Sequence, residues 1–330
     1  MVAGRDGNAR KAHAVCRMSP LPETTSSQPL VLLMSIGMTR LPRSTNEVSM
    51  RAAVGSRLAH ADIVASQREE ATSMCSDPDG HPPIESAGHT SASGHEIGLI
   101  AGDGNRCTAY QADAPLPTGV GMVVLPDYHG LTGFYRELAL RVAEDGIDAV
   151  AIDYYGRTAE PPPRDLSFEP ERHARRTRWS DLQADVAAAA AHLRMRRHVK
   201  TLFSIGFCFG GRVSFLLGSL PELRMAGVIG FYGWPVGPFL NDTPAPAEVA
   251  DHLVAPLLGI FGGADQKIPA DDVESFRQAL VAASAEHDIR SFENAPHSFF
   301  DRAQAEHGQA ATDAWATVRG FINSHTEARG

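Results

Sequence analysis

The sequence has no long apolar run and little cysteine. No stretch approaches the roughly 20 apolar residues of a membrane-spanning helix, and residues 29–38 (PLVLLMSIGM) lack the cleavage site of a secretory signal. The four cysteines lie far apart, without a C-x-x-C pair or a Cys/His cluster. These absences argue against a membrane anchor, a zinc site and a disulfide framework. We therefore expect a cytoplasmic protein that uses neither metal nor organic cofactor.

Charge is moderately negative and spread along the chain. The net charge of −9 argues against a nucleic-acid partner, and we expect a small-molecule partner instead. An apolar fraction of 43% is ordinary for a soluble globular protein. We expect a monomer, with a dimer as the alternative.

The first 92 residues differ from the rest. They are rich in Ser, Thr, Ala, Arg and Gly and show no sustained helix or strand period. We interpret them as a disordered extension, or as sequence upstream of a later start at Met50 or Met74. An Arg-rich and Ser-rich targeting peptide is the alternative. Residues 93–326 form the expected folded domain and residues 327–330 a short tail.

From about Ile97 onward, apolar runs alternate with helical patterns. A capping box formed by Ser180 and Gln183 is expected to open one of the helices. Residues 242–252 are Pro-rich and are expected to form a loop. Strands are expected at 121–127, 148–153, 201–206, 226–233, 256–263 and 289–296, and helices at 133–146, 184–198, after 208, at 269–283 and at 311–323. Apolar strands alternating with helices predict a mostly parallel sheet covered on both faces.

Cys208 lies at the end of an expected strand, within GFCFGG (residues 206–211). A nucleophile raised on a tight strand-to-helix turn leaves no room for neighbouring Cβ atoms, which explains flanking glycines. The following helix start also favours a thiolate and an oxyanion. The alternative is a small buried cysteine packed among glycines.

Asp265 and His297 follow the next expected strands, after LLGIFGGA and RSFENAP. Asp265 alone could be a turn or capping residue. Together with Cys208, however, the three residues occur in the chain order and strand positions of the α/β-hydrolase arrangement. We therefore predict a Cys-His-Asp triad.

Three segments carry a resemblance to a known family: GFCFGGR, GGADQKIP and APHSFFDR. With VVLPDYHGLTGFYRELALRVAEDGIDAVAIDYYGR, they make residues 97–323 similar to the dienelactone hydrolase family of α/β-hydrolases. The resemblance implies an α/β-hydrolase fold, with Cys208 as nucleophile, His297 as general base and Asp265 orienting the imidazole. It also implies an oxyanion hole made by the backbone N–H groups of Phe209 and Tyr128.

The same resemblance raises questions about the substrate. The family commonly has a thiol-modulating glutamate where this chain has Asp127, which is one methylene shorter. Members that bind dienelactone use two arginines, of which Arg157 matches the first. The second normally lies four residues after the histidine, where this chain has Asp301 followed by Arg302. Both arginines have a surface-charge alternative, and Tyr232 is a candidate pocket wall or a packing residue.

The function implied is hydrolysis of an ester or lactone through a thioester acyl-enzyme, of the carboxymethylenebutenolidase type or a related small substrate. Three alternatives remain open. They are a non-catalytic ligand-binding protein of the same fold, an acyltransferase, and a redox protein using Cys208, for which Cys107 could be the second thiol.

Overall fold

The computed structural model describes residues 81–84, 91–164, 167–301 and 304–327 of the chain. Residues 1–92, which we interpret as a disordered extension or as sequence upstream of a later start, lie almost entirely outside this part. The candidate starts at Met50 and Met74 lie outside it too. The proposed tail at 327–330 lies largely outside it too. Among the described helices, none is long and apolar enough to cross a membrane.

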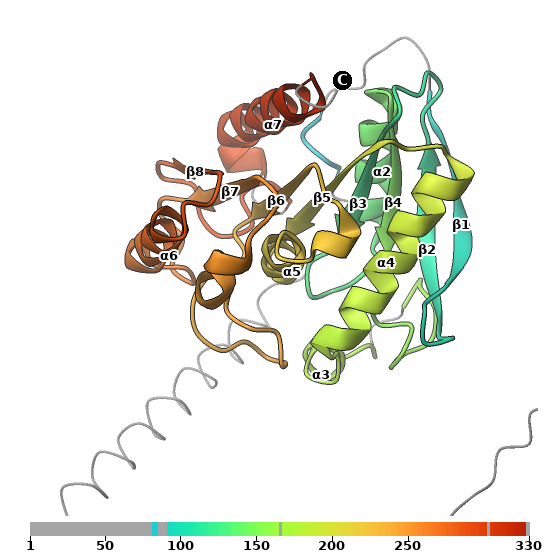
Figure 1. Cartoon of the computed structure of the whole chain (residues 1–330), viewed down its shortest axis with the longest axis horizontal. Helices are drawn as coiled ribbons and strands as arrows, with labels where there is room; N and C mark the ends of the chain where they lie inside the picture. Colours follow the sequence, from blue (N-terminus) through green and yellow to red (C-terminus); the bar gives the residue numbers. More distant parts are fainter. Residues whose placement is uncertain (1–80, 85–90, 165–166, 302–303, 328–330) are drawn as a thin grey trace, which may run out of the picture. The chain divides into compact units, whose positions relative to one another are not determined.

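Eight strands form one sheet in the order β1-β2-β4-β3-β5-β6-β7-β8 (Figure 1). Strands β3 to β8 run parallel, whereas β2 is antiparallel to both β1 and β4. The predicted mostly parallel sheet is therefore confirmed. The strands are β1 (Ser93–Ile100), β2 (Arg106–Asp113), β3 (Val120–Leu125), β4 (Ile147–Ile152), β5 (Thr201–Phe207), β6 (Gly227–Phe231), β7 (Leu257–Gly262) and β8 (His287–Phe292).

Helices cover the sheet on both faces, with α4 and α5 on one side and α7 on the other (Figure 1). The packing of β6 shows this division. A Cβ on Gly227 would meet Phe321 of α7, whereas a Cβ on Gly230, three residues along the strand, would meet Phe215 of α5. The helices are α2 (Gly133–Glu144), α3 (Pro170–Ala174), α4 (Trp179–Arg196), α5 (Phe209–Leu217), α6 (Ala270–Ala282) and α7 (Gln304–Glu327), with short 3₁₀ helices at Pro221–Leu223 and Pro246–His252.

The central strands are largely apolar because both of their faces are covered. Every residue of β3, β4, β6 and β7 is buried. Strands of this kind form continuous apolar runs, which made them visible in the sequence. β1 and β2 both escaped prediction because neither has such a run. Most residues of β1 are exposed, and in β2 buried residues alternate with partly exposed ones.

Two local predictions were wrong. Ser180 and Gln183 do not cap α4, which begins at Trp179 without a side-chain cap from its own first residues. Instead, Asp242 Oδ1 accepts the Trp179 N–H at 2.6 Å, so a distant loop satisfies the helix start. That same loop was expected to be irregular, but it contains the 3₁₀ helix Pro246–His252.

Candidate active site

Cys208 is the single residue between β5 and α5. Its backbone has φ 54° and ψ −112°, a positive-φ conformation that is strained for a residue with a Cβ. Its N–H donates to the carbonyl oxygen of Phe231 at 3.0 Å, which ties the turn to the end of β6. The turn therefore holds Cys208 at the carboxyl edge of the parallel strands, where ligands bind in sheets of this kind.

The glycines around Cys208 are required sterically. A Cβ on Gly206 would lie 2.0 Å from the carbonyl oxygen of Gly210. A Cβ on Gly210 would lie 2.2 Å from the oxygen of Leu125 and 2.3 Å from that of Pro126. The second contact also shows that the loop after β3 lies directly against the turn that carries Cys208.

Replacing Gly210 with alanine is expected to lower the free energy of unfolding by about 3 kcal/mol, because neither carbonyl can move without displacing a buried strand end. Urea unfolding measures this loss. Gly320→Ala is the matched control, since Gly320 lies in α7 and its Cβ would meet nothing within 4 Å. That variant should be stabilised by about 0.5–1 kcal/mol. Equal stability of the two variants would contradict the packing described here.

Asp265 and His297 form a buried pair. Asp265 Oδ2 lies 2.8 Å from His297 Nδ1, and the side chains are 0% and 7% exposed. The other oxygen, Oδ1, accepts the N–H groups of Lys267 at 2.8 Å and Ile268 at 3.1 Å. Asp265 thus supports its own turn and the imidazole together, so the two roles considered for it from the sequence are not exclusive.

Contacts between the loops bring the pair and Cys208 to one edge. The loop after β7 joins the loop after β8 through the N–H of Ala264, which donates to Ala295 O at 3.0 Å. The His297 ring lies 5.1 Å from the ring of Tyr232, the residue after the Phe231 that holds Cys208. Trp234 packs on the imidazole at 4.9 Å. The loop after β6 thereby links the candidate nucleophile to the candidate base.

Two buried tyrosines hold the loop between β3 and α2. The Tyr154 hydroxyl donates to the carbonyl oxygens of Pro126 and Asp127, and the Tyr155 hydroxyl donates to that of Tyr128 at 2.5 Å. Burial raises the pKa of both phenols well above 10, so they remain donors at neutral pH. The loop that contains the expected oxyanion donor Tyr128 is therefore fixed by its carbonyl groups.

Asp127 is turned toward its own loop. Its Oδ1 accepts the His129 N–H at 2.8 Å, and its Oδ2 lies 3.0 Å from His129 Nδ1. These contacts give the carboxylate a structural function in the loop. Its modulation of the Cys208 thiol stays a prediction.

Comparison with known proteins identifies the family of the chain. The model of the dienelactone hydrolase family matches residues 107–326. The chain belongs to the dienelactone hydrolase family. As a member, it is a hydrolase that acts on ester bonds, and its fold is the predicted α/β-hydrolase fold.

Individual relatives cover most of the described fold. The chain is 32% identical over 226 residues to the "Putative carboxymethylenebutenolidase" of Escherichia coli strain K12, covering 66% of this chain and 82% of that protein. It is 31% identical to the carboxymethylenebutenolidase of Rhodococcus opacus, covering 65% and 84%. The crystal structure of a "Putative Dienelactone Hydrolase" from Klebsiella pneumoniae is 28% identical, with a TM-score of 0.64, and the match covers 71% of this chain and 99% of that one.

Arg157, the first arginine expected from the dienelactone hydrolase family, is bound by carboxylates of the protein. It donates to Asp185 Oδ1 at 2.8 Å and to Asp103 Oδ2 at 2.6 Å. This network gives Arg157 a structural role that differs from the expected surface-charge alternative, because its side chain is only 15% exposed. A substrate contact by Arg157 stays a prediction. Arg302 lies outside the described residues. Asp301 is buried, and the Tyr135 hydroxyl lies 3.4 Å from its Oδ2.

Arg212, the last residue of the segment GFCFGGR, has a role that was not predicted from the sequence. Arg212 lies in α5, is 0% exposed, and reaches the loop after β6. Its guanidinium donates to the carbonyl oxygens of Trp234, Gly237 and Thr243, each at 3.0 Å, and to Thr243 Oγ1. Burial lowers its pKa to about 10, so it stays charged at neutral pH. An arginine four residues after the nucleophile, in a mostly apolar helix, was the available signal.

Cys107 is poorly placed to act with Cys208. It lies in β2, and the order β2-β4-β3-β5 puts three strand spacings, about 14 Å, between the two strands concerned. A disulfide needs Cα atoms within about 7 Å. Burial, with Asp185 nearby, raises the pKa of the Cys107 thiol to about 12. The redox alternative therefore gains no support from this cysteine.

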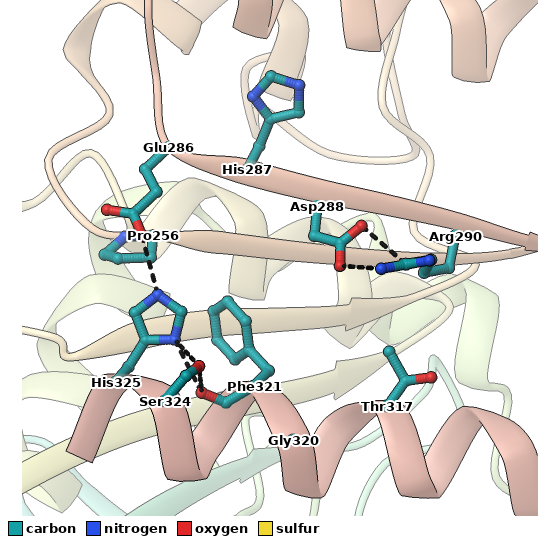
Figure 2. A pocket seen from close by; sticks show the side chains of 10 residues that line it. All are labelled: Pro256, Glu286, His287, Asp288, Arg290, Thr317, Gly320, Phe321, Ser324 and His325. Carbon is teal, nitrogen blue, oxygen red and sulfur yellow. Dashed lines mark hydrogen bonds and ion pairs between the residues drawn. The ribbon is translucent and has the colours of Figure 1, made fainter. Parts of the chain in front are cut away.

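A cleft between β8 and α7 is separate from the candidate active site. Figure 2 shows two ion pairs among the residues that line it. Asp288 pairs with Arg290 within β8, and Glu286 pairs with His325 of α7. Its other walls include Pro256, at the amino-terminal end of β7. Asp265 and His297 follow the opposite ends of these strands. Within the described residues, no cluster of three or more His, Cys, Asp or Glu side chains could hold a metal ion.

Proposed function

We propose that this protein hydrolyses small carboxylic esters or lactones through a thioester acyl-enzyme on Cys208. The observation that carries the proposal is the strained turn of Cys208 at the same sheet edge as the buried His297–Asp265 pair. The substrate class follows the relatives, two of which bear the name carboxymethylenebutenolidase.

The first step is activation of the thiol. A free cysteine has a pKa near 8.5, so little thiolate forms at neutral pH without a base. Because Asp265 Oδ2 faces Nδ1 of His297, the favoured tautomer carries its proton on Nδ1. The lone pair on Nε2 can then accept the Cys208 proton. Within the described part of the chain, Nε2 is buried and makes no hydrogen bond, to Cys208 or to any other group, so its lone pair is unoccupied.

Acylation and deacylation follow as ordinary acyl transfer. The thiolate sulfur attacks the carbonyl carbon, and the developing oxyanion is bound by the N–H groups of Phe209 and Tyr128. His297 gives its proton to the departing alkoxide, leaving a thioester. Water, deprotonated by His297, attacks the thioester and releases the acid and the free thiol.

The test is a stopped-flow reaction with a short-chain nitrophenyl ester, followed by mass spectrometry of the quenched protein. We expect a burst of nitrophenol close to one equivalent and an acyl adduct on the peptide that contains Cys208. Turnover without any adduct on Cys208 would refute the proposed mechanism. An adduct that water does not remove, but a thiol or alcohol does, would instead identify an acyltransferase.

A further inference from the structure

We propose that Tyr154 is a positioning residue that aims one oxyanion donor, the N–H of Tyr128. This inference rests on the proposed function, because it concerns the same tetrahedral intermediate. It starts from the hydrogen bond between the Tyr154 hydroxyl and the carbonyl oxygen of Asp127, at 2.5 Å. Tyr154 itself follows β4 and is 1% exposed.

The peptide group between Asp127 and Tyr128 links this hydrogen bond to the oxyanion donor. The carbonyl of Asp127 and the N–H of Tyr128 belong to one planar peptide unit. In a trans peptide these two groups point in opposite directions. A hydroxyl that holds the carbonyl on one side therefore directs the N–H to the other side. Tyr154 fixes the donor without contacting the substrate.

Tyr154 also contacts the other half of the oxyanion hole. Its ring lies edge-on to the Phe209 ring, with centroids 5.3 Å apart. Phe209 is the first residue of α5, where backbone N–H groups have no partner within the helix. Gly210, the next residue, lies against the carbonyl oxygen of Pro126, which accepts the same Tyr154 hydroxyl. One buried side chain thus touches both of the segments that carry the two donors.

Tyr155 provides an internal comparison. Its hydroxyl is equally buried and holds the neighbouring carbonyl, that of Tyr128. The N–H in that peptide unit belongs to His129, which already donates to Asp127. Loss of the Tyr155 hydroxyl therefore loosens the same loop without releasing the oxyanion donor.

The experiment compares Tyr154→Phe with Tyr155→Phe, both of which keep the aromatic ring. Removal of an oxyanion donor costs roughly 10²–10³ in rate, and a donor that is misaimed rather than lost should cost about tenfold in kcat. We expect this loss for Tyr154→Phe, with KM for a nitrophenyl ester unchanged. Affinity for a trifluoromethyl ketone, which forms a tetrahedral adduct with the thiolate, should fall about tenfold too. Tyr155→Phe should stay within about threefold of wild type.

Two further readouts separate positioning from instability and from thiol activation. Rates are taken per acylated site from the burst amplitude, so incomplete folding does not imitate a slower reaction. The pH profile of Cys208 alkylation by iodoacetamide should be the same in wild type and Tyr154→Phe. A wild-type kcat in Tyr154→Phe, equal losses in both variants, or a shifted alkylation profile would overturn the inference. Absence of a Cys208 burst in the wild type would instead refute the proposed function.

Discussion

Replacing Cys208 with alanine is expected to lower kcat for a short-chain nitrophenyl ester by about 10⁴-fold or more, and to remove the burst. Loss of the nucleophile removes the covalent route altogether, leaving only what the oxyanion hole and binding contribute. Alanine keeps the Cβ that the strained turn already accommodates, so the fold should be retained. Steady-state and stopped-flow rates measure the change, and circular dichroism checks the fold.

Cys107→Ala is the matched control for this substitution. Cys107 is a free, buried thiol of the same domain, and its raised pKa keeps it protonated. Its replacement should leave the burst and kcat within about threefold of wild type. If Cys208→Ala turned over esters as fast as this control, the turn after β5 would be a packing feature and the nucleophile would lie elsewhere.

Replacing Asp265 with asparagine should reduce kcat by about 10²–10⁴-fold with little loss of structure. The amide oxygen can still accept the N–H groups of Lys267 and Ile268, which preserves the turn. The amide NH₂ then faces His297 Nδ1, which must become an acceptor. The proton moves to Nε2, so the imidazole can no longer deprotonate the thiol. Measuring kcat and the alkylation rate of Cys208 detects both effects.

Asp271→Asn controls for the loss of one negative charge in the same segment. Asp271 is exposed in the first turn of α6. This variant should keep kcat within about twofold of wild type. A similar alkylation rate for Asp265→Asn and wild type would show that Asp265 does not set the protonation of His297.

The central fold and the candidate triad could be predicted because each has a local signal. β3, β4, β6 and β7 are buried throughout and largely apolar, and Asp265 follows one of them, β7. Cys208 follows β5, which is buried in all but its first residue. His297 follows β8, in which Ile289 alone is buried, and it was found through the segment APHSFFDR instead. β1 has no apolar run, because its residues face water along most of its length.

Contacts between distant segments could not be predicted in this way. The start of α4 is satisfied by Asp242, 63 residues away. The partners of Arg157, Asp103 and Asp185, come from two other segments. The Tyr154 hydroxyl bonds to a carbonyl 27 residues earlier. A single sequence gives no period or motif for such pairs, whose formation depends on the completed fold.

The buried guanidinium of Arg212 restricts movement of the loop after β6, which it holds through Trp234, Gly237 and Thr243. Swinging the segment from Trp234 to Thr243 outward would strip a cation in the interior of the neutral oxygens that hold it. An unsolvated charge costs several kcal/mol, far more than the thermal energy available for breathing motions. The segment from Trp234 to Thr243 is therefore expected to stay in place, and with it the Trp234 ring that packs on the His297 imidazole.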